Sequence, residues 1–187
     1  WLGTTRVGGT DCAAFDADCV TLNGYMGSDA IKPFLDQCVA RNKSAFVLAK
    51  TSNPSSVELQ DMVAGDRVVY TVMGDLIERW GKDTAGKYGY NALGAVVGAT
   101  HPSVLKELRR RLEHTFFLVP GYGAQGGTAA DVRCAFDELG RGAIVNASRS
   151  IMCAWKKTGK DGMDYQEAAR AAAEQMRDEL REYITIL

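Results

Sequence analysis

One stretch decides the fold: Phe116-Phe117-Leu118-Val119-Pro120-Gly121-Tyr122-Gly123-Ala124-Gln125-Gly126-Gly127. Residues 115–119 are apolar and rich in β-branched and aromatic side chains, which predicts a buried strand. The glycines that follow allow positive φ angles and a close approach of a ligand to the backbone. Thr128 is a candidate N-cap for a helix over residues 129–139, whose free N–H groups and dipole would attract an anion such as phosphate. The alternative is a tight turn that needs its glycines for steric reasons alone.

Strands and helices alternate along the rest of the chain. Strands are predicted at residues 17–22, 45–49, 93–99, 115–119 and 142–145. Helices are predicted at residues 29–40, 57–62, 67–82, 104–113, 129–139, 151–155 and 163–183, whereas residues 1–11 show no clear period. This order is typical of parallel strands joined by helical crossovers, so the expected class is α/β. We expect a single domain over residues 1–187, which is either an open doubly wound sheet or about the last five units of a (β/α)8 TIM barrel.

Composition excludes several classes of function. The formal net charge of −1 argues against a nucleic-acid-binding protein, and no apolar run has the length of a membrane span. The five cysteines include no C-x-x-C pair, which favours free thiols in a reducing compartment. Since no signal peptide is visible, we expect a cytoplasmic protein. The two histidines, His101 and His114, are too far apart to predict a metal site.

The loops after the last two predicted strands are the strongest candidate site. In (β/α)8 barrels these two loops often bind a phosphate beside a short extra helix. Arg149 stands at the start of such a helix, where a guanidinium can hold a phosphate through two parallel hydrogen bonds, and Gln125 offers an amide donor. The alternatives are a surface ion pair for Arg149 and a solvated side chain for Gln125.

A second candidate follows the strand at residues 45–49. Hydroxyl and amide groups of the Thr51-Ser52-Asn53-Pro54 stretch suit the polar edge of a heterocycle, although the same residues also favour a simple turn before a proline. Asn23 holds the same position one unit earlier in the chain. Lys50 is expected either to face this rim or to be solvated.

Four segments resemble one known family. They are Lys50-Thr51-Ser52-Asn53-Pro54-Ser55-Ser56, Gly94-Ala95-Val96-Val97-Gly98-Ala99-Thr100, the stretch from Phe117 to Gly127, and Gly142-Ala143-Ile144-Val145-Asn146-Ala147-Ser148-Arg149-Ser150-Ile151. In this order they look like orotidine 5′-phosphate decarboxylase of the longer bacterial subgroup, from about Phe15 to the C-terminus. The Pro-Gly-x-Gly-Ala-Gln-Gly-Gly string and the later Ser-Arg-Ser are the most specific parts of the resemblance.

The resemblance implies a (β/α)8 barrel that works as a homodimer. It implies decarboxylation of orotidine 5′-monophosphate to uridine 5′-monophosphate in de novo pyrimidine biosynthesis, without a metal or an organic cofactor. Carried over by motif, the 5′-phosphate would contact Gln125 and Arg149, with help from the backbone at Gly123 and Ser148. Ser52 would hydrogen-bond the pyrimidine edge and Pro120 would pack near the base. The less certain binding residues are Thr51, Asn53 and Asn23.

One departure from the family is large. The family's chemistry belongs to an Asp-x-Lys-x-x-Asp motif after the third strand of the barrel, and no such motif occurs in these 187 residues. We therefore expect no catalytic residue in this chain, with the catalytic segment upstream of Trp1, and we expect residues 1–187 alone to be inactive. The alternatives are another phosphate-binding barrel, such as a sugar-phosphate isomerase or aldolase, or an inactive fragment. Five parallel strands with two open edges should also expose apolar surface.

Overall fold

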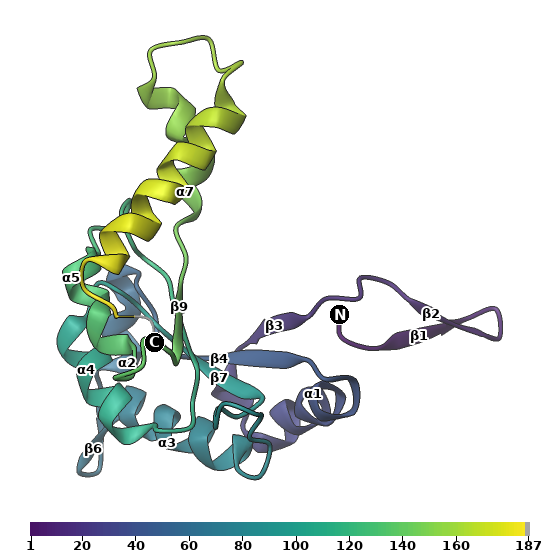
Figure 1. The fold of residues 1–187 in the computed structure, drawn as a ribbon. Helices are drawn as coiled ribbons and strands as arrows, with labels where there is room; N and C mark the ends of the chain where they lie inside the picture. The colour runs from purple at the N-terminus through teal and green to yellow at the C-terminus, as the bar shows by residue number, and fades with distance from the viewer. Residues whose placement is uncertain (186–187) are drawn as a thin grey trace.

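A computed structural model describes residues 1–185 and is organised around a five-stranded parallel sheet (Figure 1). The strand order is β3-β4-β7-β8-β9, which follows the order of the chain. Their bounds are β3 (Cys19–Leu22), β4 (Ser44–Lys50), β7 (Leu93–Val97), β8 (Phe117–Val119) and β9 (Ala143–Val145). All four pairings are parallel, so the α/β class with helical crossovers is confirmed. These strands are five consecutive units of a (β/α)8 barrel rather than a doubly wound sheet, because each new strand adds on the same side of the last.

Helices cover one face of this sheet. They are α1 (Ser28–Arg41), α3 (Val69–Gly81) and α4 (Pro102–Arg111), and α1 and α3 pack directly on β4. Along β4 the side chains of Ala45, Val47 and Ala49 are buried on this face, whereas Phe46 and Leu48 between them are half-exposed. This alternation places the core between the sheet and its helices.

The edges of the sheet and part of its other face are open in the described residues, although all of β7 at the centre is buried. On β9, at one edge, Ile144 is 52% exposed, and the pattern on β3 at the other edge alternates exposed and half-buried residues. The expectation that open edges expose apolar surface is therefore confirmed.

The N-terminal residues form a hairpin that the periodicity did not predict. Strands β1 (Thr4–Val7) and β2 (Thr10–Ala13) pair antiparallel, extend away from the main sheet, and are exposed throughout (Figure 1). Gly8 and Gly9 connect them with φ angles of 57° and 87°, the conformation of the two-residue turns that suit hairpins. The Gly-Gly pair between two short threonine-containing runs was the available sequence signal.

The predicted helix over residues 129–139 is wrong in its extent. Helix α5 (Ala129–Val132) ends after one turn and continues as a 3-10 turn, η3 (Arg133–Ala135). Asp137 explains the stop: its Oδ1 accepts hydrogen bonds from the backbone N–H groups of Leu139 and Arg141, at 2.9 and 2.8 Å. Its Oδ2 accepts the Tyr90 hydroxyl at 2.7 Å, so a tertiary contact competes with the helix.

The remaining elements are short, apart from the C-terminal helix. In chain order they are η1 (Gly24–Met26), η2 (Pro54–Ser56), α2 (Val57–Gln60), β5 (Val63–Ala64), β6 (Arg67–Val68), α6 (Ser148–Met152), η4 (Ala154–Lys157) and α7 (Tyr165–Arg181). The two-residue strands β5 and β6 form a small hairpin. Residues 67 and 68, at the start of the predicted helix 67–82, are therefore in a strand, and the helix begins at Val69. The long helix predicted at residues 163–183 is confirmed as α7, which packs on α5, α6 and η4.

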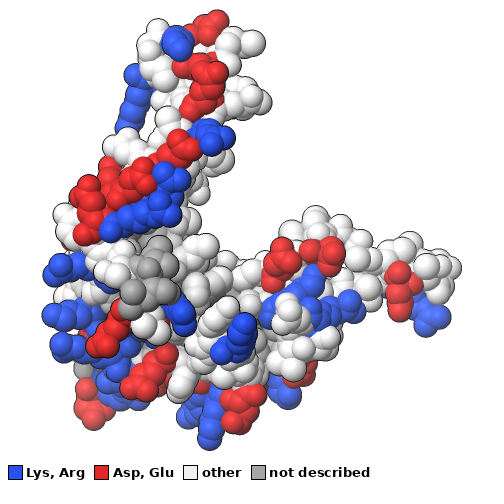
Figure 2. Space-filling view, in the orientation of Figure 1, with Lys and Arg blue, Asp and Glu red and all other residues white. Residues whose placement is uncertain are grey.

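Charges of both signs are spread over the surface. On the face in Figure 2, acidic and basic side chains alternate along α7 and over the helices below it. This distribution agrees with the net charge of −1. Within residues 1–185, no helix has the length and apolar character needed to cross a membrane.

Candidate functional site

A polar cleft lies where strands β4, β8 and β9 end. Its volume is about 140 Å³, and its walls come from three loops that follow these strands. Because the carboxyl ends of parallel strands share one rim of the sheet, residues far apart in sequence meet here. The lining residues are Ser52, Pro120, Gly121, Tyr122, Ala124, Gln125, Asn146, Ala147, Ser148 and Arg149.

The glycine-rich loop is shaped by its own backbone hydrogen bonds. The N–H of Gly123 donates to the carbonyl of Gly127 at 2.8 Å, and the N–H of Gly126 donates to the carbonyl of Gly123 at 2.8 Å. The Thr128 side chain and Asp131 then form a capping box that starts α5. The N–H of Gly123 is engaged inside the loop and Gly123 is not among the residues that line the cleft, so its help in binding phosphate stays a prediction.

Gly121 is the position where the first and second of these loops touch. A Cβ atom at Gly121 would lie 2.8 Å from Oε1 of Gln125 and 2.9 Å from Cβ of Ser52. The φ angle of Gly121 is +95°, which L side chains rarely adopt. A larger residue here would push Ser52 and Gln125 apart, so the glycine allows the two candidate binding residues to approach each other.

The third loop brings Arg149 to the same cleft. Ala147 is buried and anchors the loop after β9, while Ser148 and Arg149 are exposed at the start of α6. Gln125 and Arg149, which were proposed from sequence as phosphate ligands, therefore lie on one cleft together with Ser148, Ser52 and Pro120. That these residues bind phosphate or a pyrimidine stays a prediction.

The less certain candidates lie outside the residues that line this cleft. Thr51 donates a hydrogen bond from Oγ1 to Oδ1 of Asn53 at 2.6 Å, which closes a turn beside Ser52. Asn23 accepts the N–H of Tyr25 at 3.0 Å and caps the η1 turn. Each of the three has a local structural role, and a part in binding is untested.

Lys50 corrects an expectation. Its side chain is not solvated, because only 1% of it is exposed, and it is not among the residues that line the cleft. The ammonium lies 2.6 Å from Oδ1 of Asp61 and 6.0 Å from the ring centre of Tyr70. A shift of register between Leu48 and Lys50 at the end of β4 accompanies this burial, and a single-sequence period cannot reveal such a shift.

Two of the polar residues that line the cleft have no role of their own predicted from the sequence. Asn146 follows β9 directly and lies, like Ser52 and Gln125, in a loop at the carboxyl end of a strand. Tyr122 lies within the glycine-rich stretch, whose pattern predicts no separate role for it. Burial raises the pKa of the Tyr122 hydroxyl, and so does its hydrogen bond to Glu179 of α7.

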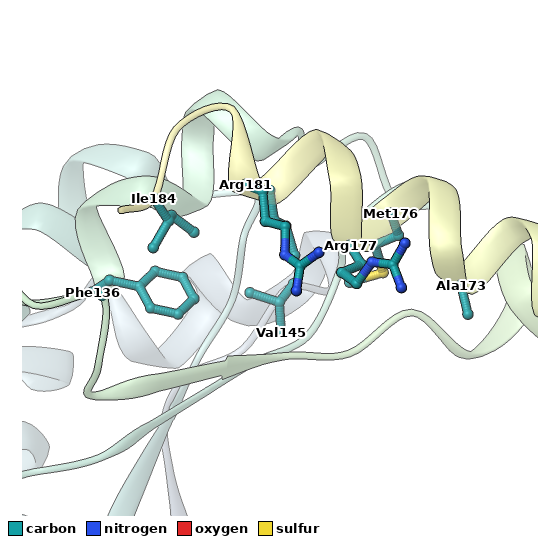
Figure 3. Close-up of a pocket in the computed structure, with 9 residues that line it drawn as sticks. Phe136, Val145, Ala173, Met176, Arg177, Arg181 and Ile184 are labelled. Carbon is teal, nitrogen blue, oxygen red and sulfur yellow. The ribbon is translucent and has the colours of Figure 1, made fainter. Parts of the chain in front are cut away.

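A larger cavity of about 330 Å³ lies beneath α7 (Figure 3). Its walls are mostly apolar, with Phe136 and Ile184 at one end and Val145 below the helix. Arg177 and Arg181 border it, and Nε of Arg177 is paired with Asp178 at 2.8 Å. This cavity lacks the convergent loop donors of the polar cleft. Among residues 1–185 no group of three or more His, Cys, Asp or Glu residues is arranged to hold a metal ion.

Comparison with known proteins shows the family. The model of the orotidine 5′-phosphate decarboxylase / HUMPS family matches residues 8–160. The orotidine 5′-phosphate decarboxylase of Caldicellulosiruptor bescii is 40% identical over 185 residues, which cover 99% of this chain and 60% of that protein. The enzyme of the same name from Clostridium perfringens is 45% identical over 171 residues, which cover 91% of this chain and 59% of that protein.

Solved structures agree with this likeness. Leishmania donovani UMP synthase matches with a TM-score of 0.70 and 35% identity, over 89% of this chain and 34% of that one. Leishmania donovani OMP decarboxylase matches with a TM-score of 0.68 and 32% identity, over 88% of this chain and 58% of that one. The chain thus spans about three-fifths of the length of the curated relatives described above.

Proposed function

Because this chain belongs to the orotidine 5′-phosphate decarboxylase / HUMPS family, we propose that it serves the decarboxylation of orotidine 5′-monophosphate to uridine 5′-monophosphate. This reaction is a step of pyrimidine biosynthesis and needs neither a metal nor an organic cofactor. The chain supplies the loops that bind the nucleotide. The single observation that supports this most is the convergence of Ser52, Gln125 and Arg149 on one cleft.

The phosphate half of the cleft consists of Gln125, Ser148 and Arg149. A guanidinium presents two parallel N–H donors to a phosphate, and charge-assisted hydrogen bonds of this kind are short and strong. The exposed Arg149 is free to take this geometry at the cleft's edge. Binding of the unreactive phosphate then holds the rest of the nucleotide in place for the chemical step.

The base half of the cleft consists of Ser52 and Pro120. The Ser52 hydroxyl can both donate and accept a hydrogen bond, which suits the alternating polar edge of a pyrimidine. Pro120 offers an apolar surface at the end of β8 for the face of the base. Contact between the Ser52 and Gln125 loops at Gly121 links the two halves of the cleft.

The reacting groups are proposed to lie outside these 187 residues. Loss of CO₂ leaves a carbanion-like carbon, which needs a positioned cation and a proton donor. Lys50 does not fit this role, because its buried ammonium is paired with Asp61 and does not line the cleft. We therefore propose that residues 1–187 alone bind the nucleotide without decarboxylating it.

Titration calorimetry tests the binding half of this proposal. The 187-residue protein is titrated with uridine 5′-monophosphate, and uridine serves as the matched control that lacks the phosphate. We expect the nucleotide to bind and the nucleoside to bind far more weakly. Equal affinities, or no binding of either compound by the folded protein, would remove the phosphate site.

A chimera tests the catalytic half. The segment of the Caldicellulosiruptor bescii relative that precedes the matched region is fused ahead of Trp1, and loss of orotidine 5′-monophosphate is followed by absorbance. Activity in the chimera and none in residues 1–187 supports the proposal. Equal activity in both proteins contradicts it, since the reacting groups would then lie in this chain.

Homodimer formation and a cytoplasmic location belong to the same proposal. Apolar side chains are exposed on the loops after β3 and β4, at the same rim of the sheet as the cleft, and a partner subunit would cover them: Tyr25, Met26, Val57, Leu59 and Met62. All five cysteines have free thiols, which suits a reducing compartment. Sedimentation equilibrium tests the dimer, and a monomer at micromolar concentration would count against it.

A further inference from the structure

The loop that presents Ser52 is closed at its base by two separate contacts. In the first, Nζ of Lys50 pairs with Oδ1 of Asp61 at 2.6 Å. In the second, the N–H of Thr51 donates to Oε1 of Gln60 at 2.9 Å, and Nε2 of Gln60 donates back to Oγ1 of Thr51 at 2.9 Å. The segment between them, residues 52–59, contains η2 and all of α2 except Gln60. Both ends of the loop are therefore fixed where it leaves β4 and where it returns.

The ion pair at this base is markedly asymmetric in exposure. The Lys50 side chain is 1% exposed, whereas the Asp61 side chain is 41% exposed. Tyr70 of α3 lies under the ammonium, and its hydroxyl donates to Oε2 of Glu107 at 2.9 Å. His101, at the start of α4, borders the same region. A buried ion pair is weak evidence for stability, because well-packed apolar side chains often stabilise a protein equally well. Its directional contact, however, specifies where the loop must return.

Ser52 is also in contact with the loop that follows β7. Its carbonyl accepts the Thr100 hydroxyl at 3.3 Å. A Cβ atom at Gly98 would lie 2.8 Å from both N and Cα of Ser52, so the backbones of the two loops are in direct contact. The carbonyl of Lys50 accepts the N–H of Gly98 at 2.7 Å. A shift of Lys50 would therefore reach Ser52 through one short chain of contacts.

From these contacts we infer that Lys50 and Asp61 are positioning residues for the pyrimidine half of the cleft. Their ion pair, together with Gln60, sets the place of Ser52 relative to Gln125, while the phosphate half depends on other loops. This inference rests on the proposed function, and it goes beyond it by giving a role to a buried charge that lies outside the residues lining the cleft.

The test compares two ligands that share a phosphate. Uridine 5′-monophosphate needs both halves of the cleft, whereas ribose 5-phosphate needs only the phosphate half. We expect Lys50→Met to weaken binding of uridine 5′-monophosphate roughly tenfold, the effect of one lost polar contact, and to leave ribose 5-phosphate binding unchanged. Lys50→Arg, which can still pair with Asp61, should restore most of the affinity.

A matched control and a second variant complete the design. Lys32→Met removes the lysine of an exposed ion pair on α1, in which Lys32 is 73% exposed, and should change neither affinity. Gln60→Ala cuts the second closure of the loop without touching a buried charge. This substitution should also weaken binding of uridine 5′-monophosphate and leave ribose 5-phosphate binding unchanged. It tests the inference if Lys50→Met does not fold.

Each contrary outcome is distinct. Unchanged affinity for uridine 5′-monophosphate in the folded Lys50→Met protein overturns the inference, as does an equal loss for both ligands that arginine does not rescue. If Lys50→Met does not fold, unchanged affinity in Gln60→Ala overturns it. Failure of the unmodified protein to bind uridine 5′-monophosphate instead counts against the proposed function.

Discussion

Tyr122 donates a hydrogen bond from its hydroxyl to a carboxylate oxygen of Glu179, and this contact joins the glycine-rich loop to the C-terminal helix α7. Tyr122 is 8% exposed and Glu179 is half-buried, so the bond is partly shielded from water. The other carboxylate oxygen of Glu179 accepts Nε2 of Gln175 at 2.8 Å. The position of a loop that lines the candidate cleft therefore depends on a helix far along the chain.

Removing the Tyr122 hydroxyl should loosen this connection. For Tyr122→Phe we expect the free energy of unfolding to fall by about 1 kcal/mol, the usual net effect of one hydrogen bond. Urea titration followed by circular dichroism measures the change. Tyr165→Phe is the matched control, because Tyr165 is 53% exposed, and its stability should stay within about 0.5 kcal/mol of the unmodified protein. Equal effects in both variants would show that the Glu179 contact contributes nothing.

Arg149→Ala should weaken nucleotide binding through the phosphate alone. A charge-assisted hydrogen bond contributes about 1.5–3 kcal/mol, so we expect a loss of roughly 10- to 150-fold in affinity for uridine 5′-monophosphate. The affinity of Arg149→Lys should fall between those of the unmodified protein and Arg149→Ala, since an ammonium keeps the charge but not the two parallel donors. Calorimetry with uridine as the second ligand checks the assignment. A comparable loss for uridine would mean that Arg149 acts on the base or on the fold.

Gly98→Ala should disturb both stability and binding, because its Cβ would meet the backbone of Ser52 at 2.8 Å. Backbone atoms cannot turn away as a flexible side chain does. We expect a loss of about 1–3 kcal/mol in the free energy of unfolding, together with weaker binding of uridine 5′-monophosphate. Gly86→Ala is the control, since its nearest neighbour, the carbonyl oxygen of Tyr90, would be 3.7 Å away in ordinary contact. If the two variants unfold at the same urea concentration, the loops do not touch as described.

His101 should make the protein less stable in mild acid. Burial lowers the pKa of His101, with a smaller effect from the positive charge of Lys50, and the nearby carboxylate of Asp61 opposes this shift only in part. Below the unfolded-state pKa of about 6.5, the unfolded chain then binds more protons than the folded one, so stability falls as the pH drops through this range.

Chemical denaturation at several pH values between 8 and 5 checks this sign. In His101→Gln, which cannot titrate, the decrease in stability between pH 7 and pH 5 should be smaller than in the unmodified protein. The measurement at pH 8 reports any loss caused by the substitution itself. An identical slope in both proteins would show that His101 is equally free to protonate in the folded and the unfolded state.

Much of the sheet is predictable because its signals are local. The strands β3, β4, β7, β8 and β9 each fall within or close to an apolar run, and the alternation with helices predicts parallel pairing. Thr128 was identified as the N-cap of α5 from residue type and position, and the structure confirms it. Such features depend on neighbours within a few residues, which a single sequence contains in full.

Errors arose where distant contacts override a local preference. Residues 133–139 have a helical pattern, but Asp137 binds nearby backbone N–H groups and the Tyr90 hydroxyl, so the helix ends early. Lys50 looks like a solvated lysine until a change of register and the return of the chain to Asp61 bury it. Tyr90 lies 47 residues from Asp137 and Asp61 lies 11 residues from Lys50, so the local hydrophobic period reveals neither of these two contacts.

The sequence by itself determined the parallel α/β architecture and the loops that hold the candidate ligands, because strand propensity, glycine content and capping are properties of short segments. Only the tertiary structure decided that Ser52, Gln125 and Arg149 share one cleft, that Gly121 lets the first two approach, and that Lys50 is buried and paired with Asp61. These relationships join segments that are far apart along the chain. Their geometry follows from the parallel pairing of the strands, which places the carboxyl ends of all of them at one rim of the sheet. No single segment specifies this pairing.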